Sequence, residues 1–246
     1  MSVQVYQLAH SPYCLPITRA LEALGVAFNV VNVSNADRSE IIRLTNGAYY
    51  QVPVLAHDGK LVFDGSGVAA EERRRTTTDE PPHPHVGGYD GLDVPRYVDR
   101  TWAQGRLFPA ALAGVQAILI PHIEGEVEGA TFKLTDIHYL PTLTDLVDRV
   151  MVVRHKERRF GRGCVDQWRA NYDSLFAHAT ELLRPFDAMA AARPFLLGPQ
   201  PVYTDFALYG VLANLTYNDW NPFPPLPRLA EWFARMKAFR FQQETT

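Results

Sequence analysis

The sequence predicts a small α/β domain followed by an all-helical domain. Apolar runs of strand length alternate with segments of helical period over the first 75 residues, and a stretch rich in proline, glycine and threonine follows at residues 76–91. Beyond residue 92 the apolar residues recur at helical spacing. We therefore place an α/β domain at residues 1–76, a linker at residues 77–91 and a helical domain at residues 92–246.

The composition is typical of a water-soluble globular protein. Of 246 residues, 47% are apolar, and the formal net charge of −3 argues against a general binder of nucleic acid. No apolar run approaches the roughly 20 residues of a membrane span, and the N-terminus lacks signal-peptide features, so we expect a cytoplasmic protein that crosses no membrane. The two cysteines, Cys14 and Cys164, are too few for a disulfide framework or a cysteine-rich zinc site, and we expect no metal.

A short polar turn separates the first predicted strand from the first predicted helix. Residues 3–8 form a β-branched and aromatic run, and the apolar residues after the turn recur at helical spacing. Pro16 has no N–H and is tolerated only in a first turn, so the helix is expected to begin near Leu15. Its free amide groups and positive dipole end should then lie close to Ser11 and Cys14.

Two interpretations of this turn stay open. A hydroxyl and a thiol three residues apart match a dithiol redox motif whose leading cysteine is replaced by serine, and such a turn is suited to hold a thiolate. Alternatively, Ser11 only caps the helix and Cys14 is a small buried residue.

The rest of the first domain is expected to continue as strand, helix, strand, strand and helix. Pro53 removes a ladder hydrogen bond from its strand, which leaves edge placement, a bulge or a cis peptide bond as explanations. Asp58 and Gly59 lie between two apolar runs and predict a tight hairpin, because both tolerate positive φ angles. The predicted elements are strands at residues 28–33, 52–56 and 61–63, and helices at residues 38–45 and 64–75.

The second domain is expected to bury most of its apolar helix faces. The clearest helix carries one apolar stripe from Val165 to Phe186. Tyr97, Trp102 and Phe108, near the domain junction, either line a substrate pocket or simply pack. Further helices are predicted at residues 143–160, 205–215 and 229–239.

This order of motifs resembles the soluble glutathione S-transferases. The resemblance rests on Ser11-Pro12-Tyr13-Cys14, Gln51-Val52-Pro53-Val54-Leu55, Asp58-Gly59, Asp64-Gly65-Ser66, Leu197-Gly198, Thr204-Asp205-Phe206-Ala207 and Leu229 to Met236. It covers most of the chain and implies a thioredoxin-like α/β domain followed by an all-α domain, in agreement with the two domains predicted above.

By this resemblance, the first domain binds glutathione as a co-substrate, and no further cofactor is needed. The hydroxyl of Ser11 would donate a hydrogen bond to the glutathione sulfur, with Tyr6 and Tyr13 as alternative donors. Pro53 would be cis, so that the backbone of Val52 pairs with the tripeptide like an added strand.

The resemblance also implies which residues hold the rest of the tripeptide. Gln51 would help to hold the peptide. The γ-glutamyl end would be held at Asp64 and Gly65, although the family has serine at the second of these positions; the N–H of Gly65 and the hydroxyl of Ser66 are the substitutes. Val202 stands where many members carry the serine or threonine of a capping box with the following aspartate.

Three functions are compatible with the resemblance. We expect a glutathione S-transferase, as in detoxification, that stabilises the glutathione thiolate with Ser11 and transfers it to a small hydrophobic electrophile between the domains. The first alternative is a thiol–disulfide oxidoreductase in which Cys14 forms a mixed disulfide with glutathione. The second is a binding module of the same fold without catalysis. The resemblance also implies a homodimer.

Overall fold

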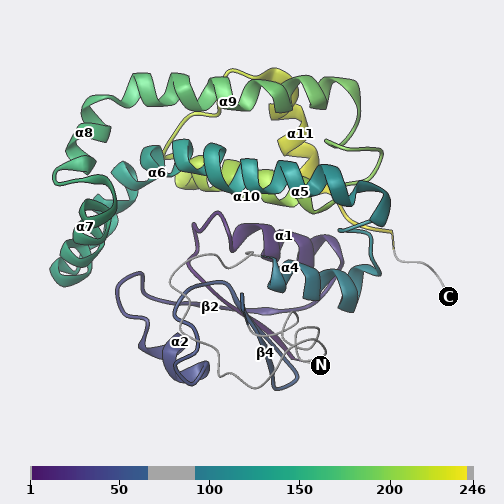
Figure 1. Ribbon diagram of the computed structural model, residues 1–246, viewed down its shortest axis with the longest axis horizontal. Coiled ribbons are helices and arrows are strands. Elements are labelled where there is room, and N and C mark those ends of the chain that lie inside the picture. Colours follow the sequence, from purple (N-terminus) through teal and green to yellow (C-terminus); the bar gives the residue numbers. More distant parts are fainter. Residues whose placement is uncertain (1, 66–91, 243–246) are drawn as a thin grey trace.

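A four-stranded sheet forms one layer of the molecule (Figure 1). The structure is a computed structural model and describes residues 2–65 and 92–242. The strand order is β2-β1-β3-β4, with β1 parallel to β2, β1 antiparallel to β3, and β3 antiparallel to β4. The strands are β1 (Val3–Gln7), β2 (Asn29–Asn32), β3 (Val54–His57) and β4 (Lys60–Val62).

The predicted strands are confirmed, with boundaries that differ by one or two residues. Asp58 and Gly59 have φ angles of 45° and 83° and join β3 to β4 in the predicted hairpin. β3 begins at Val54 instead of residue 52, because Pro53 has no N–H to give to the ladder. The Val52–Pro53 peptide bond is cis, which is one of the three explanations considered for this proline.

Helices cover both faces of the sheet. α1 (Leu15–Ala23) lies between the sheet and the helical layer and shares one core with β1 through Ile17 and Leu21. α2 (Ser39–Leu44) covers the opposite face, where Ile41 packs in a second cluster with Val54. α4 (Asp93–Val98) contacts α1 and β4, so the first residues after the predicted linker pack against the sheet layer.

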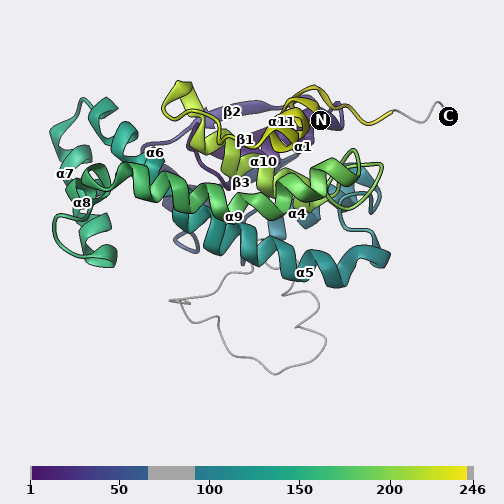
Figure 2. The same ribbon diagram turned by 90° about the horizontal axis from the view of Figure 1, so that it is seen from above.

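The helical layer is built around α10, which is buried along most of its length. It contacts α1, α5, α6 and α11. Seen from above, α9 runs along the length of the molecule between α5 and α11, and α7 and α8 lie at one end (Figure 2). Within the described ranges, no helix combines the length and the apolar character needed to cross a membrane. The helices are α5 (Ala113–His122), α6 (Glu128–Thr142), α7 (Leu146–Phe160), α8 (Cys164–Ala170), α9 (Tyr172–Ala192), α10 (Tyr203–Leu215) and α11 (Pro227–Ala238).

The prediction of a single long helix from the apolar stripe is wrong, because the stripe spans two helices. α8 ends and α9 begins on either side of Asn171. The side-chain amide of Asn171 donates to the carbonyl oxygen of Gln167 at 2.7 Å, and such local bonds compete with a continuous helix. The helix predicted at residues 64–75 and the linker at residues 77–91 lie almost wholly outside the described residues.

Gly210 allows α10 to approach α1 closely. A Cβ atom at this position would lie 2.4 Å from the backbone oxygen of Pro12 and 2.5 Å from the ring of Pro16, and neither group is able to move aside easily. The two layers therefore meet at a position that requires glycine.

We expect Gly210→Ala to destabilise the protein by about 1–3 kcal/mol through overpacking, although alanine is the better helix former by about 1 kcal/mol. Gly129→Ala in α6 is the matched control, because no atom lies within 4 Å of its Cβ position, and it should be neutral or stabilising. Urea unfolding of both variants measures the difference. Equal stability of the two variants would contradict this account of the α1–α10 contact.

Candidate functional site

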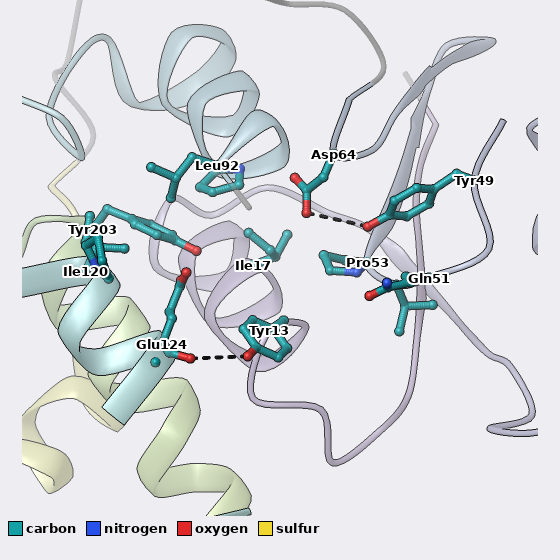
Figure 3. A pocket seen from close by; sticks show the side chains of 14 residues that line it. Tyr13, Ile17, Tyr49, Gln51, Pro53, Asp64, Leu92, Ile120, Glu124 and Tyr203 are labelled. Atoms are coloured by element: carbon teal, nitrogen blue, oxygen red, sulfur yellow. Dashed lines mark hydrogen bonds between the residues drawn. The ribbon is translucent and has the colours of Figure 1, made fainter. Parts of the chain in front are cut away.

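A cavity of about 550 Å³ lies between the sheet layer and the helical layer (Figure 3). Its volume is within the usual range of small-molecule sites. Residues from four parts of the chain form its wall: the β1–α1 turn with the start of α1, the segment around β3 and β4, the start of α4, and the helical layer. Among the wall residues are Tyr13, Gln51, Pro53, Asp64, Glu124 and Tyr203.

Ser11 lies in the β1–α1 turn but not in the wall of this cavity. Its side chain is buried, and its hydroxyl oxygen accepts hydrogen bonds from the backbone N–H groups of Tyr13 at 3.2 Å and Cys14 at 3.3 Å. The hydroxyl therefore stabilises the turn that leads into α1, whose N-cap residue is Cys14 and receives no side-chain cap bond. Because the oxygen acts as an acceptor in both bonds, its single hydrogen can be donated, and the sulfur of Cys14 competes for it.

α10 supports the same turn from the helical layer. The side-chain amide of Asn214 donates to the carbonyl oxygen of His10 at 2.5 Å, and Asn214 accepts a hydrogen bond from the hydroxyl of Thr135 at 3.0 Å. These buried contacts fix the residue that precedes Ser11. The position of the turn thus depends on the packing of both layers.

Cys14 is fully buried beneath the turn. Burial raises the pKa of its thiol to about 11. The hydrogen bond with Ser11 lowers this pKa, but by less than burial raises it. The thiol is therefore protonated at neutral pH and has no access to solvent. In the part of the chain that the structure describes, no three His, Cys, Asp or Glu side chains are grouped as metal ligands would be.

The cavity brings together four of the residues predicted to hold glutathione. Gln51, Val52, Pro53 and Asp64 all contribute to its wall. Val52 precedes β3 and lies outside the pairing between β1 and β3. Gln51 is exposed, and its side-chain amide donates to the hydroxyl of Tyr50 at 3.3 Å.

Asp64 directs a carboxyl group into the cavity (Figure 3). The Tyr49 hydroxyl lies 3.5 Å from one of its oxygens, whereas the other oxygen is buried and has no hydrogen-bond partner among the described residues. Burial, and then the carboxylate of Asp93, raise the pKa of Asp64 to about 6. The backbone N–H of Gly65, predicted to be available for a ligand, donates to a carboxylate oxygen of Asp93 at 2.7 Å. Ser66 lies outside the described residues.

Of the aromatic residues predicted either to contact a ligand or to pack, some lie in the cavity wall and others in the core. Tyr13 lines the cavity, and its hydroxyl donates to the backbone oxygen of Glu124 at 3.4 Å. Tyr97 and Trp102 pack around His57, and Phe108 stacks on the ring of Tyr203. None of these three is part of the cavity wall.

Among the wall residues that were not predicted from the sequence, Glu124 and Tyr203 bring polar groups from the helical layer. Tyr203 is the first residue of α10 and directly precedes the Thr204-Asp205 motif. That motif was recognised in the sequence and marks the helix to which Tyr203 belongs. Glu124 lies in η3 (Ile123–Val127), a π-helical turn that joins α5 to α6. Such a turn has no simple apolar period that a sequence would reveal.

Comparisons with known proteins agree on the fold. A glutaredoxin family model matches residues 3–62, and no curated protein sequence matches the chain. A glutathione S-transferase from Ceriporiopsis subvermispora, solved in complex with glutathione, aligns over 100% of both chains with 14% identity and a TM-score of 0.73. The chain has the glutathione S-transferase fold. The predicted thioredoxin-like α/β unit followed by a helical unit is thereby confirmed.

Two further structures share this fold. The theta class glutathione S-transferase of Xanthomonas axonopodis pv. citri, with glutathione bound, aligns over 96% of this chain and 93% of its own, with 18% identity and a TM-score of 0.61. Glutaredoxin 2 of Salmonella typhimurium, in complex with glutathione, aligns over the same shares with 18% identity and a TM-score of 0.66. Transferases and a glutaredoxin thus resemble this chain to a similar degree.

Proposed function

We propose that the protein is a glutathione S-transferase that binds glutathione in the cavity between its two layers. The observation that carries this proposal is the wall formed by Gln51, Val52, Pro53 and Asp64, since the three consecutive residues before β3 and the aspartate after β4 lie on one cavity. The three structures named above were each solved with glutathione, which supports the same ligand here.

The wall offers groups that are complementary to a tripeptide. The backbone of Val52 is outside the sheet and would pair with the peptide as an added strand. The partnerless oxygen of Asp64 would accept a hydrogen bond from the γ-glutamyl ammonium group, whose positive charge would also favour the ionised carboxylate. Asp93 would have to release the N–H of Gly65 before a ligand carboxylate could bind there.

Ser11 remains our proposed donor to the glutathione sulfur. A thiol pKa near 8.5 must fall by about two units for the thiolate to predominate at neutral pH, which requires about 2.7 kcal/mol. One hydrogen bond to a charged acceptor contributes about 1.5–3 kcal/mol, and a helix N-terminus adds about 0.3–1 kcal/mol. Tyr13 is the competing donor, because its side chain lines the cavity.

An oxidoreductase is the second candidate, because the glutaredoxin model and glutaredoxin 2 resemble this chain. Such an enzyme needs a thiolate that can attack a disulfide. The buried Cys14, with its pKa raised to about 11, is poorly suited to that role, which favours the transferase. The transferase proposal also includes a small hydrophobic electrophile as the second substrate and a homodimer as the assembly.

Glutathione at a hundredfold excess over its dissociation constant should stabilise the native state by about 2.7 kcal/mol, which a thermal unfolding scan detects.

Asp64→Asn keeps the size of the side chain but removes its charge, and it should weaken glutathione binding about tenfold or more, as measured by calorimetry. Asp166→Asn is the control, because this aspartate is 85% exposed in α8 and should not affect binding. Absence of both thermal stabilisation and binding heat would contradict the proposal and favour a module without catalysis.

A further inference from the structure

α7 packs on the rest of the molecule with only one of its faces. Val152 is buried, and Val153 and Phe160 pack in the same apolar cluster. Lys156 forms an ion pair with Asp136 of α6 at 2.6 Å. These contacts hold α7 against α6 and α8 and fix which side of the helix is turned outward.

The outward face of α7 begins with an apolar stripe. Four side chains in the first turns are 69%, 69%, 55% and 50% exposed, and these are Leu146, Val147, Val150 and Met151. Because residues four apart lie on the same side of a helix, the four form one surface. α7 lies at one end of the molecule in both views (Figure 1 and Figure 2), and no described residue covers the stripe. Contiguous exposed apolar side chains mark a site of interaction with a protein or a membrane.

The same face becomes basic toward the end of α7. Exposed arginines continue it at a spacing of four residues: Arg154, Arg158 and, just after the helix, Arg162. Arg158 and Arg162 form no ion pair with a described residue, whereas Arg154 has a partner in its own helix. The whole chain has a formal net charge of −3, so the positive charge is concentrated locally on this face.

The acidic residues of α7 do little to neutralise this face, because both are half-buried and engaged within the protein. Asp148 accepts a hydrogen bond from the hydroxyl of Ser34 at 3.4 Å, and Glu157 pairs with Arg154 at 2.6 Å. Asp145, the exposed acid before the helix, accepts the backbone N–H of Asp148 at 2.9 Å and caps the first turn. The outward face therefore combines apolar side chains with unpaired cations.

We propose that this face of α7 docks the protein on the surface of an anionic lipid bilayer. The apolar side chains enter the boundary between headgroups and acyl chains, and the arginines contact the headgroup phosphates, as in helices that lie on membranes. The protein stays at the surface, since no helix among the described residues could span a bilayer. Docking needs no glutathione, so this inference does not rest on the proposed function.

Size and charge favour a lipid surface over a protein partner. The face comes from one helix, whereas a stable protein interface uses about 20–30 residues from each side. A bilayer needs only a narrow apolar stripe with neighbouring cations, and its affinity grows with both. In a two-fold pair of copies joined through this face, the arginines would meet arginines or apolar side chains, and no exposed carboxylate of α7.

Flotation with lipid vesicles tests the inference directly. The protein should float with vesicles made of equal parts of phosphatidylglycerol and phosphatidylcholine, and it should stay in solution with vesicles of phosphatidylcholine alone. Raising the salt concentration from about 0.1 M to about 1 M shortens the Debye length from about 10 Å to about 3 Å and should weaken the binding.

A variant of the apolar stripe tests insertion. Val147→Ser should weaken binding to the mixed vesicles about five- to tenfold, because it removes apolar surface that enters the bilayer. Ile118→Ser in α5 is the matched control, since Ile118 is 72% exposed and Val147 is 69% exposed. The control should bind the vesicles as the unmodified protein does.

A variant of the arginines tests the contact with headgroups. Arg158→Gln combined with Arg162→Gln should weaken binding about 25-fold, because each cation near an anionic surface contributes about fivefold. Arg184→Gln combined with Arg228→Gln removes the same charge from side chains that are 60% and 56% exposed in α9 and α11. This control should leave the binding unchanged.

The inference is overturned if the unmodified protein does not float with the mixed vesicles, or if the control variants lose as much binding as the α7 variants. A loss confined to the arginine variant would make the face a site for acidic macromolecules and would overturn it too. A dimer that Val147→Ser converts into a monomer in sedimentation would show that a second copy covers the face instead. None of these results bears on glutathione binding, which is measured separately.

Discussion

Asp205→Ala is expected to lower the free energy of unfolding by about 3–5 kcal/mol, because three buried donors would lose their acceptor. The carboxylate accepts hydrogen bonds from the N–H groups of Leu196 at 2.8 Å and Val202 at 3.1 Å, and from the indole N–H of Trp232 at 3.0 Å. Asp205 and Trp232 are both 0% exposed, so water cannot replace the lost acceptor. The carboxylate thus ties α10 to α11 and to the segment that precedes α10.

Urea unfolding measures this loss, and Asp205→Asn keeps the experiment informative should the alanine variant not fold. The asparagine retains one acceptor oxygen and should give a smaller destabilisation than alanine. Asp166→Ala is the control, because its surface pair with Arg169 should contribute less than about 1 kcal/mol. A loss of less than about 1 kcal/mol in Asp205→Ala would show that the three donors find other partners.

Ser11→Ala is expected to lower transferase turnover at neutral pH about 10- to 100-fold, if the hydroxyl stabilises the thiolate of glutathione. The same change should raise the pKa of the bound glutathione thiol by about one to two pH units, because one hydrogen bond to the charged form is lost. Binding of glutathione should change little, since the neutral thiol gains less from this donor. Ultraviolet titration of the thiolate, turnover with an aryl halide and calorimetry measure the three quantities.

The structure adds a second expectation for this variant. The oxygen of Ser11 accepts two backbone hydrogen bonds in the turn before α1, so alanine should also cost about 1 kcal/mol of stability. Ser11→Thr keeps a hydroxyl and should retain both the turn hydrogen bonds and part of the turnover, whereas Tyr13→Phe removes the competing donor. A fully active Ser11→Ala protein together with an inactive Tyr13→Phe protein would reassign the sulfur contact to Tyr13.

Much of the first unit could be predicted because its signals are local. Pro16 restricts where α1 begins, and Asp58 with Gly59 tolerates the positive φ angles of the hairpin, whatever the remainder of the chain does. The grouping of Gln51, Val52 and Asp64 in one cavity wall was implied instead by a resemblance in motif order. Asn171 shows the limit of such signals, because an apolar stripe continues across two helices whose hydrogen bonding is interrupted between them.

The sequence by itself determined the strand and helix order and the hairpin, since each depends on residues close together in the chain. Only the tertiary structure decided that Glu124 and Tyr203 meet opposite Asp64 (Figure 3) and that Gly210 must lack a side chain. These features depend on how two layers pack across long separations in the chain. Packing of that kind is set by the shapes and charges of many residues at once, and no local pattern encodes it.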